Sequence, residues 1–142
     1  MPILAGTACA HPAIFAQGPQ AVEGTYVMDS GGNVNPQALP DSWPSKALQL
    51  DFAKLYQAKY NAAPDFFAAD GADLVTTLVA AMKQAGEVDQ AKVAQALIGL
   101  KDLPALEGLL NFPPDATSMG IHGSMVEWQV KGGQFVLVNT IN

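Results

Sequence analysis

The first residues of the chain contain a short apolar run, Ile3-Leu4-Ala5, that stops at Gly6. A continuous apolar run bounded by a glycine is typical of a strand buried on both faces in a parallel sheet. The small residues after Gly6 predict a turn, and Pro12 suits the first turn of a helix over residues 12–17. Strand, loop and helix in this order form half of a βαβ unit, so the sequence predicts an α/β fold. Because a parallel strand needs neighbours on both sides, we expect this one to come from the middle of a larger sheet.

An export signal is the alternative interpretation of the same residues. Such a signal needs a basic segment followed by a long apolar one. No lysine or arginine precedes Lys46, and the apolar segment Pro2–Gly6 is too short. We therefore expect no signal peptide in this chain. No stretch approaches the roughly 18 consecutive apolar residues of a membrane-spanning helix.

The charge of the chain argues against several classes of partner. Its 142 residues carry a formal net charge of −6, and every cation is a lysine. Nucleic acids and anionic membranes are bound by clustered cations, so we expect neither as a partner. Without arginine, the chain also lacks the side chain that captures phosphate or carboxylate in a bidentate way. Cys9 is the only cysteine, which excludes an internal disulfide.

The clearest helix follows a short predicted strand at Tyr26–Met28 and a turn-rich segment at 29–41. Glycine, asparagine and proline cluster in that segment, which is predicted to be a linker. Ser42 is the expected N-cap of the helix, which should end before Pro64, because a residue that precedes proline disfavours the α region. Apolar and aromatic residues have the spacing of one buried helix face: Leu48, Phe52, Leu55, Tyr56 and Tyr60.

Two further helices are predicted before residue 100. One begins at Asp70 or Asp73, after a short extended segment at 66–68, and Gly86 suits its C-terminal cap. At a helix start these two carboxylates are interpreted as caps rather than as a catalytic pair. Asp89 is the expected N-cap of the next helix. The apolar residues of each helix fall on one face: Leu74, Val75, Leu78, Val79 and Met82 in the first, and Val93 and Leu97 in the second.

Residues 106–142 have the pattern of β-structure. Leu106–Phe112 is predicted to form one strand. Two further segments flank Lys131-Gly132-Gly133 and predict a hairpin with a glycine turn. Apolar residues alternate with polar ones in the first of these segments, which should therefore have one buried and one solvated face: Val126, Trp128 and Val130.

Four segments, in their order along the chain, resemble the C-terminal portion of type I periplasmic-binding proteins. The resemblance is in particular to the branched-chain amino acid (Leu/Ile/Val) substrate-binding family of ABC transporters. The segments are PILAG with FAQGPQAVEGTYV, DFAKLYQAKYNAAPDFFAADGADLVTTLVAAMKQAG, LEGLLNFPPDA and VEWQVKGGQFVLV. They are similar to that family's strand and hinge strand, its paired helices, its G-x-x-x-F-D strand and its closing hairpin. The chain departs from the pattern at Ala72, where the family has tyrosine, and at Pro113, which replaces an aspartate.

The resemblance implies a doubly wound, two-lobed α/β fold with a C-terminal β-hairpin. The ligand of such a fold lies between the lobes, at the carboxyl ends of the strands. Residues 1–28 would supply a strand, loop and helix of lobe two and a hinge strand, and residues 29–41 a linker. Residues 42–105 would supply helices of lobe one, and residues 106–142 a hinge strand and the terminal hairpin. Neither lobe would be complete.

By the same resemblance, the loop that holds Thr7, Ala8 and Cys9 faces the ligand. Amino-acid receptors of this family place an acidic residue near Thr7 to bind the ammonium group of the ligand. Here the side chain is a neutral hydroxyl, which can form a hydrogen bond but no charge pair. This favours a solute that is less cationic than an amino acid. The alternative role for Thr7 is to cap the helix at 12–17.

Metal binding and catalysis are the competing interpretations of this loop. Cys9 and His11 are two residues apart, but a metal site needs further ligands, and none is near in sequence. Cys9 as a nucleophile, with His11 or His122 as its base, would also need an orienting group and an oxyanion hole, which the sequence does not reveal. We therefore predict no catalytic residue, no metal and no cofactor, and interpret Cys9 as a small buried thiol.

Two functions are compatible with this sequence. The first is a fragment of an ABC-transporter solute-binding protein, located outside the cytoplasm, that captures an amino acid, amide or aromatic acid and works with a permease. Capture would occur by hinge closure, because a ligand that contacts both lobes favours the closed state. The second is a non-catalytic interaction or structural domain, whose bare apolar faces bind a second copy or a companion chain.

Overall fold

The computed structural model describes all residues except 116–118, 123–124 and 142, and within them it has two β-sheets and three α-helices. The first sheet has the order β1-β2-β6-β7, with strands Leu4–Ala5, Tyr26–Ser30, Met125–Lys131 and Gln134–Ile141. The second has the order β3-β4-β5, with strands Leu103–Ala105, Gly108–Asn111 and Gly120–His122. The α-helices are α1 (Lys46–Tyr60), α2 (Phe66–Ala85) and α3 (Gln90–Leu97). Short 3-10 helices are η1 (Thr7–Cys9), η2 (Pro12–Phe15), η3 (Pro19–Val22) and η4 (Pro36–Ala38).

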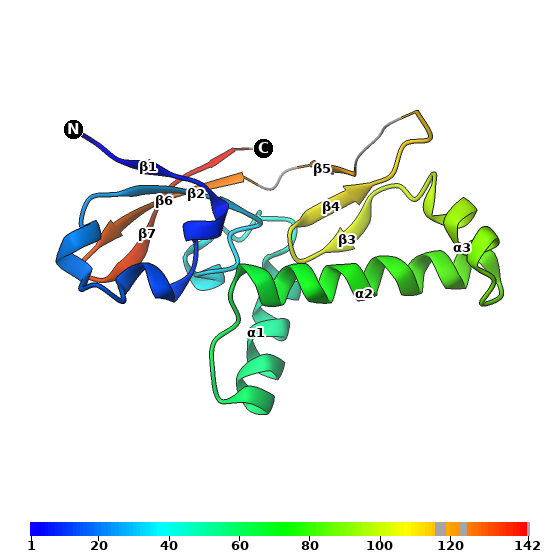
Figure 1. Cartoon of the computed structure of the whole chain (residues 1–142), viewed down its shortest axis with the longest axis horizontal. Helices are drawn as coiled ribbons and strands as arrows, with labels where there is room; N and C mark the ends of the chain where they lie inside the picture. Colours follow the sequence, from blue (N-terminus) through cyan, green and yellow to red (C-terminus); the bar gives the residue numbers. More distant parts are fainter. Residues whose placement is uncertain (116–118, 123–124, 142) are drawn as a thin grey trace.

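The two sheets lie at opposite ends of the long axis of the molecule (Figure 1). One end, which we call part A, contains the first sheet together with η1, η2 and η3. The other end, part B, contains the second sheet, with α2 along it and α3 at its far end. Helix α1 projects from the middle of the molecule. The predicted α/β class is therefore confirmed.

Strand β1 pairs in parallel with β2, in agreement with the prediction of a parallel strand, but it lies at the edge of the first sheet. The prediction that this strand is buried is wrong for this chain, since Ile3 is 59% exposed and Leu4 is 70% exposed. The physical reason is that β2 covers only one edge of β1, and no described strand pairs with its other edge. An apolar strand with an open edge can accept another strand.

Strands β6 and β7 form the predicted hairpin, and its turn residues Gly132 and Gly133 have φ values of 58° and 76°. Glycine reaches these left-handed values at little cost. Apolar and polar residues alternate on β6 as predicted, and the apolar ones are fully buried: Val126, Trp128 and Val130. They form the main core with residues from other segments: Ala10, Val27, Leu39, Trp43 and Phe135.

Helix α1 buries a different face from the one that its apolar spacing predicts. Leu55 is 69% exposed and Tyr60 is 56% exposed, whereas the buried residue of the helix is Gln49. The helix also begins at Lys46, after Ser45, so the prediction of Ser42 as its N-cap is wrong. Ser45 is buried, and its hydroxyl is satisfied because it donates to the carbonyl oxygen of Ala105 at 2.8 Å. The start of α1 thus packs through polar contacts with neighbouring backbone.

Helix α2 begins at Phe66, so the predicted extended segment at 66–68 is helical. Asp65 causes this earlier start, because its Oδ1 accepts from the backbone N–H of Ala68 at 2.8 Å and caps the helix. Gly86 ends α2 in a left-handed conformation, and Asp89 caps α3, both as predicted. No described helix is long and apolar enough to cross a membrane.

The segment predicted as one strand, Leu106–Phe112, contains a turn. Leu106 and Glu107 connect β3 to β4, which pair antiparallel. The carboxylate of Asp73 on α2 accepts from the backbone N–H of Leu106 at 2.8 Å and of Glu107 at 2.9 Å. These two hydrogen bonds hold the turn against α2. The pattern of apolar residues within 106–112 does not reveal the turn, because its partner, Asp73, lies on another element.

Parts A and B meet at a buried polar cluster that we call the junction. Side chains of Trp43 and Gln49 both donate to the carbonyl oxygen of Gly31, and Gln49 also donates to that of Leu106 at 2.8 Å. Several residues of the segment at 29–41 are buried: Asp29, Gly31, Gly32, Asn33, Pro36 and Leu39. The junction therefore ties the end of β2 to the β3–β4 turn through the start of α1.

Candidate functional site

The loop with Thr7, Ala8 and Cys9 forms η1, directly after the carboxyl end of β1. Its backbone is held by hydrogen bonds from the N–H of Cys9 to Gly6 at 2.9 Å and from the N–H of Ala10 to Thr7 at 2.8 Å. Thr7 is half-buried, and Ala8 and Cys9 are exposed. Cys9 is therefore not the buried thiol that the sequence predicts. In open α/β sheets, ligands bind beside such strand ends.

A cavity of about 340 Å³ separates this loop from the start of α2. Thr7 is not among its lining residues, so the structure brings together only two of the three predicted site residues at the cavity wall. The lining is apolar except for one imidazole and one thiol: Ala8, Cys9, His11, Ala13, Ile14 and Phe67. A pocket with mostly apolar walls and few polar groups suits a small organic molecule.

His11 has a structural role that the sequence analysis did not predict. Its Nδ1 accepts from the backbone N–H of Ala13 at 2.9 Å, which makes His11 the N-cap of η2. The alternative role predicted for Thr7, as the cap of this helix, is therefore wrong. The position of His11 directly before Pro12 is a local signal that could have identified it, because proline is common at the first helical position.

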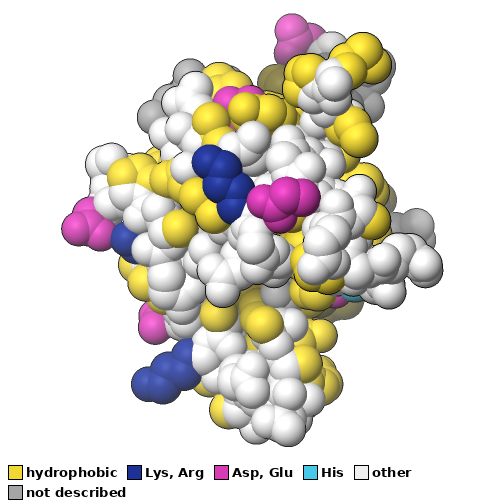
Figure 2. Space-filling view, turned by 90° about the vertical axis from the view of Figure 1, so that its left-hand side faces the viewer, with side chains coloured by type: hydrophobic (Ala, Val, Ile, Leu, Met, Phe, Trp, Pro, Cys, Tyr) yellow, Lys and Arg dark blue, Asp and Glu magenta, His cyan; other side chains and the backbone are white. Residues whose placement is uncertain are grey.

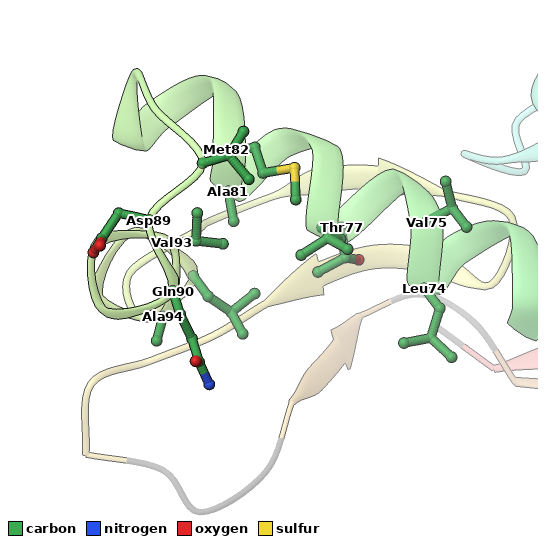
Figure 3. A pocket seen from close by; sticks show the side chains of 12 residues that line it. Leu74, Val75, Thr77, Ala81, Met82, Asp89, Gln90, Val93 and Ala94 are labelled. Carbon is green, nitrogen blue, oxygen red and sulfur yellow. The ribbon is translucent and has the colours of Figure 1, made fainter.

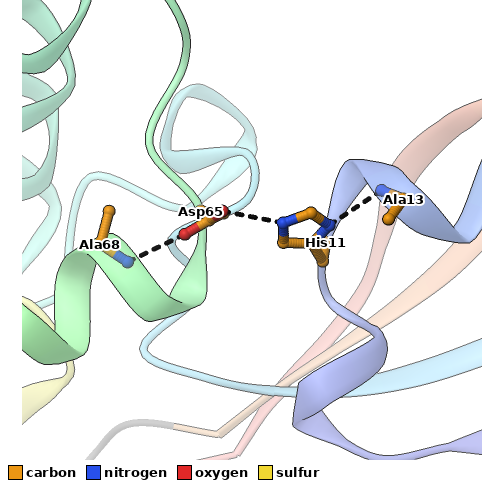
Figure 4. Close-up of polar contacts among 4 residues, drawn as sticks. All are labelled: His11, Ala13, Asp65 and Ala68. Atoms are coloured by element: carbon orange, nitrogen blue, oxygen red, sulfur yellow. Dashed lines mark hydrogen bonds and ion pairs between the residues drawn. The ribbon is translucent and has the colours of Figure 1, made fainter. Parts of the chain in front are cut away.

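A contact between part A and part B lies next to the cavity (Figure 4). His11 Nε2 is 2.9 Å from Asp65 Oδ2, and the other Asp65 oxygen caps α2 through the N–H of Ala68. The His11 ring also lies 6.0 Å from the ring of Phe67, measured between centroids. Asp65 precedes a helix, so its role as a cap could have been recognised from sequence. Its pairing with His11 could not, because the two residues belong to different parts of the fold.

These contacts bear on the competing chemical interpretations. Both ring nitrogens of His11 are occupied, by Ala13 and by Asp65, so neither is free to act as a base for Cys9. The side chain of His122, the other candidate base, lies outside the described residues. Among the part of the chain that the structure describes, no three histidine, cysteine, aspartate or glutamate side chains form a group that could hold a metal ion.

The buried carboxyl groups with shifted pKa values lie at the junction and do not line the cavity. Burial raises the pKa of Asp29 to about 7, although the indole N–H of Trp128 donates to Asp29 Oδ2 at 2.9 Å and opposes the shift. Burial, with repulsion from Asp70, Asp73 and Asp29, raises the pKa of Glu107 to about 8. Asp29 Oδ1 and Glu107 Oε1 have no hydrogen-bond partner among the described residues. Each of these two groups is therefore costly to ionise in the folded chain.

A groove of about 730 Å³ lies between α2 and α3 (Figure 3). Leu74, Leu78 and Val93 are among the apolar side chains of its walls, and Thr77, Asp89 and Gln90 also line it. Leu74 is 73% exposed and Leu78 is 48% exposed. The groove is nearly free of convergent polar groups that would orient a small ligand, so it has the character of a packing surface. At the other end of the molecule, hydrophobic side chains are interspersed with polar ones and with a few charged groups (Figure 2).

Comparisons with known proteins gave matches to periplasmic and solute-binding proteins over nearly the whole chain. A family model described as "Periplasmic binding protein" matches residues 1–134. A leucine binding protein from Thermotoga maritima has a TM-score of 0.75 at 26% identity over 99% of this chain. An extracellular ligand-binding receptor from Rhodopseudomonas palustris has a TM-score of 0.84 at 21% identity over 96% of this chain. A solute binding protein of an ABC transporter from R. palustris, solved with benzoate, has a TM-score of 0.71 at 19% identity over 99%.

The chain corresponds to a limited share of these larger proteins. It spans 37% of the leucine binding protein, 40% of the extracellular receptor and 36% of the benzoate complex. The comparison among curated proteins gave no match to the sequence.

Proposed function

Because the chain belongs to the periplasmic binding protein family, we propose that it forms part of an extracytoplasmic receptor that delivers a small organic solute to an ABC-transporter permease. The observation that carries the proposal is the family match over residues 1–134, combined with a cavity beside the loop at Thr7–Cys9. Ligand binding, rather than covalent chemistry, is the function of this site.

The proposed ligand contacts are Ala8 and Cys9 on part A, which line the cavity opposite Phe67 on part B. Thr7 lies in the same loop but outside this lining, so it would contact a ligand that extends beyond the cavity. Walls from two parts of the fold favour capture by closure, because a ligand that contacts both walls stabilises the arrangement in which they are close. The described lining of the cavity contains no carboxylate for an ammonium group, and the nearby Asp65 accepts from Ala68 and is paired with His11. We propose an amide, an aromatic acid or an amino acid as the ligand class, with preference for the less cationic solutes.

A titration followed by amide NMR spectra tests this proposal. Leucine, benzamide and benzoate are added separately up to tens of millimolar, because the wall contributed by this chain alone should bind weakly. We expect one of these probes to shift the amide signals of Ala8, Cys9 and Phe67 selectively. Ala8→Trp, which fills the cavity, should abolish the shifts, whereas Ala58→Trp on the exposed side of α1 should not. No selective shift with any of the three probes would contradict the proposal.

A second candidate function rests on the groove between α2 and α3. Its exposed leucine and valine side chains form an apolar face of the kind that usually binds another protein surface. As an interaction domain, the chain would cover this face with a second copy of itself. The sequence predicts such bare faces, and the exposure of Leu74 and Leu78 agrees with that prediction.

Light scattering coupled to size-exclusion chromatography tests the second candidate. The unmodified chain is expected to elute as a dimer or larger species at high micromolar concentration. Leu78→Lys should shift it towards the monomer, because a charge is then placed in the groove. Leu55→Lys, at an exposed position on α1 outside the groove, is the matched control and should leave the mass unchanged. A monomeric unmodified chain would rule this function out.

A further inference from the structure

Within the described residues, polar contacts join parts A and B at two places of different character. At the junction, the contacts are buried: Gln49 is 1% exposed and bonds to Gly31 and Leu106. Beside the cavity, the polar contact is the pair formed by His11 and Asp65, whose side chains are 32% and 27% exposed, and the rings of His11 and Phe67 lie next to it. A buried network of hydrogen bonds is costly to open, whereas a partly solvated ion pair can break and exchange its partner for water.

Both members of the pair are held in place by a second hydrogen bond. Because His11 Nδ1 accepts from the N–H of Ala13, Nε2 is the nitrogen that carries the proton and donates to Asp65. Asp65 in turn is fixed by the N–H of Ala68 at the start of α2. The pair therefore joins the caps of two helices, η2 on part A and α2 on part B (Figure 4).

The pair also fixes the position of the cavity walls. His11 lies two residues after Cys9, and Asp65 lies two residues before Phe67, and Cys9, His11 and Phe67 all line the cavity. A change in the distance between His11 and Asp65 is thus a change in the width of the cavity. Few other polar groups at the cavity could hold its two walls together, because the remaining described lining is apolar apart from the thiol of Cys9.

We infer that the His11–Asp65 pair is a positioning contact that stabilises the closed cleft and breaks when the cleft opens, while the junction persists as the hinge. The inference rests on the proposed function and adds to it the residues that set the open–closed balance without contacting the ligand. A partly exposed pair of this kind shifts such an equilibrium by about two- to five-fold.

The substitution Asp65→Asn removes the pair with His11 and keeps the cap of α2. Asparagine is as good an N-cap as aspartate, so its Oδ1 still accepts from the N–H of Ala68. Its amide group then faces the Nε2–H of His11 with a donor, and the pair is lost. Asp89→Asn is the matched control, because Asp89 caps α3 in the same way, through the N–H of Lys92 at 3.0 Å, and is remote from the cavity lining.

The distance between the two parts is measured directly, without ligand. Spin labels are attached to Gln17→Cys on part A and Thr76→Cys on α2, in a chain with Cys9→Ala, and the distance distribution is recorded by double electron–electron resonance. We expect Asp65→Asn to increase the fraction of longer distances about two- to five-fold. Asp89→Asn should leave the distribution unchanged. An unchanged distribution in Asp65→Asn would overturn the inference, since loss of a helix cap alone does not predict a longer distance.

Ligand titrations of the unlabelled proteins separate this inference from the proposed function. If benzoate, benzamide or leucine binds, Asp65→Asn should weaken its affinity about two- to five-fold, with an unchanged cavity lining. If none of the three binds, the proposed function fails, while the distance measurement still decides whether the pair holds the parts together. Equal affinity in Asp65→Asn and the unmodified chain, for a probe that binds, would contradict the role of the pair in closure.

Discussion

Gly31→Ala is expected to destabilise the chain by more than about 3 kcal/mol, because it combines backbone strain with a clash against backbone atoms. The φ of Gly31 is +79°, a left-handed value that non-glycine residues adopt with strain. A Cβ at this position would lie 2.7 Å from the Cα of Glu107 and 3.0 Å from the carbonyl oxygen of Leu106. Neither atom belongs to a flexible side chain, so relief would require the β3–β4 turn to move away from the junction.

Gly24→Ala separates the two contributions. Gly24 has nearly the same φ, +77°, but a Cβ there would meet no atom within 4 Å. Only the backbone strain remains, so the expected loss is about 1 to 2 kcal/mol. Chemical denaturation followed by circular dichroism measures both variants. Equal losses in Gly31→Ala and Gly24→Ala would show that the close approach at the junction does not exist in solution.

The second large effect is a loss of stability as the pH rises from about 4 to about 8. In the unfolded chain, Asp29 and Glu107 titrate near their ordinary pKa values of 3.8 and 4.5. In the folded chain, burial raises these pKa values to about 7 and about 8, so the folded state binds more protons throughout this interval. The free energy of unfolding must then fall with rising pH. Without solvent screening, these differences in pKa correspond to between about 4 and 5 kcal/mol for each group. Screening by solvent lowers the expected loss to the order of 2 to 4 kcal/mol, and more so for the less deeply buried Glu107.

Asp29→Asn and Glu107→Gln test this sign. Both amides are neutral at every pH, so each variant should be more stable than the unmodified chain at pH 9 and close to it at pH 4.5. The double variant should have the flattest dependence of unfolding free energy on pH. Asp51→Asn, at an exposed position of α1, should follow the unmodified chain. A loss of stability at pH 9 in both single variants would mean that the two carboxyl groups are ionised and partnered in the folded chain.

Local signals explain what sequence analysis predicted well. Gly132 and Gly133 define the closing hairpin, and Asp89 and Gly86 mark helix ends, because each acts on backbone groups within a few residues. The α/β class and the family resemblance follow from the order of such segments, and the structure and the family match bear both out.

Long-range contacts explain the errors. Helix α1 exposes three of the five residues of its predicted apolar stripe and buries Gln49 instead. Gln49 is buried because its side chain donates to the carbonyl oxygens of Gly31 and Leu106. Leu106 and Glu107 form a turn because Asp73, on a different helix, accepts from both of their N–H groups. Neither partner can be recognised from the spacing of residues in the segment concerned.

In the candidate site, too, some features depend on local sequence signals and others on long-range contacts. The sequence determined that the loop at Thr7–Cys9 follows a strand and that it carries the only thiol of the chain. It placed the start of the second helix at Asp70 or Asp73 and so missed the cap at Asp65. The tertiary structure decided that this loop meets the start of α2, where His11 pairs with Asp65 and Phe67 completes a cavity. The physical reason is that strands, turns and caps depend on neighbours along the chain, whereas a binding wall depends on which surfaces are brought together by burial.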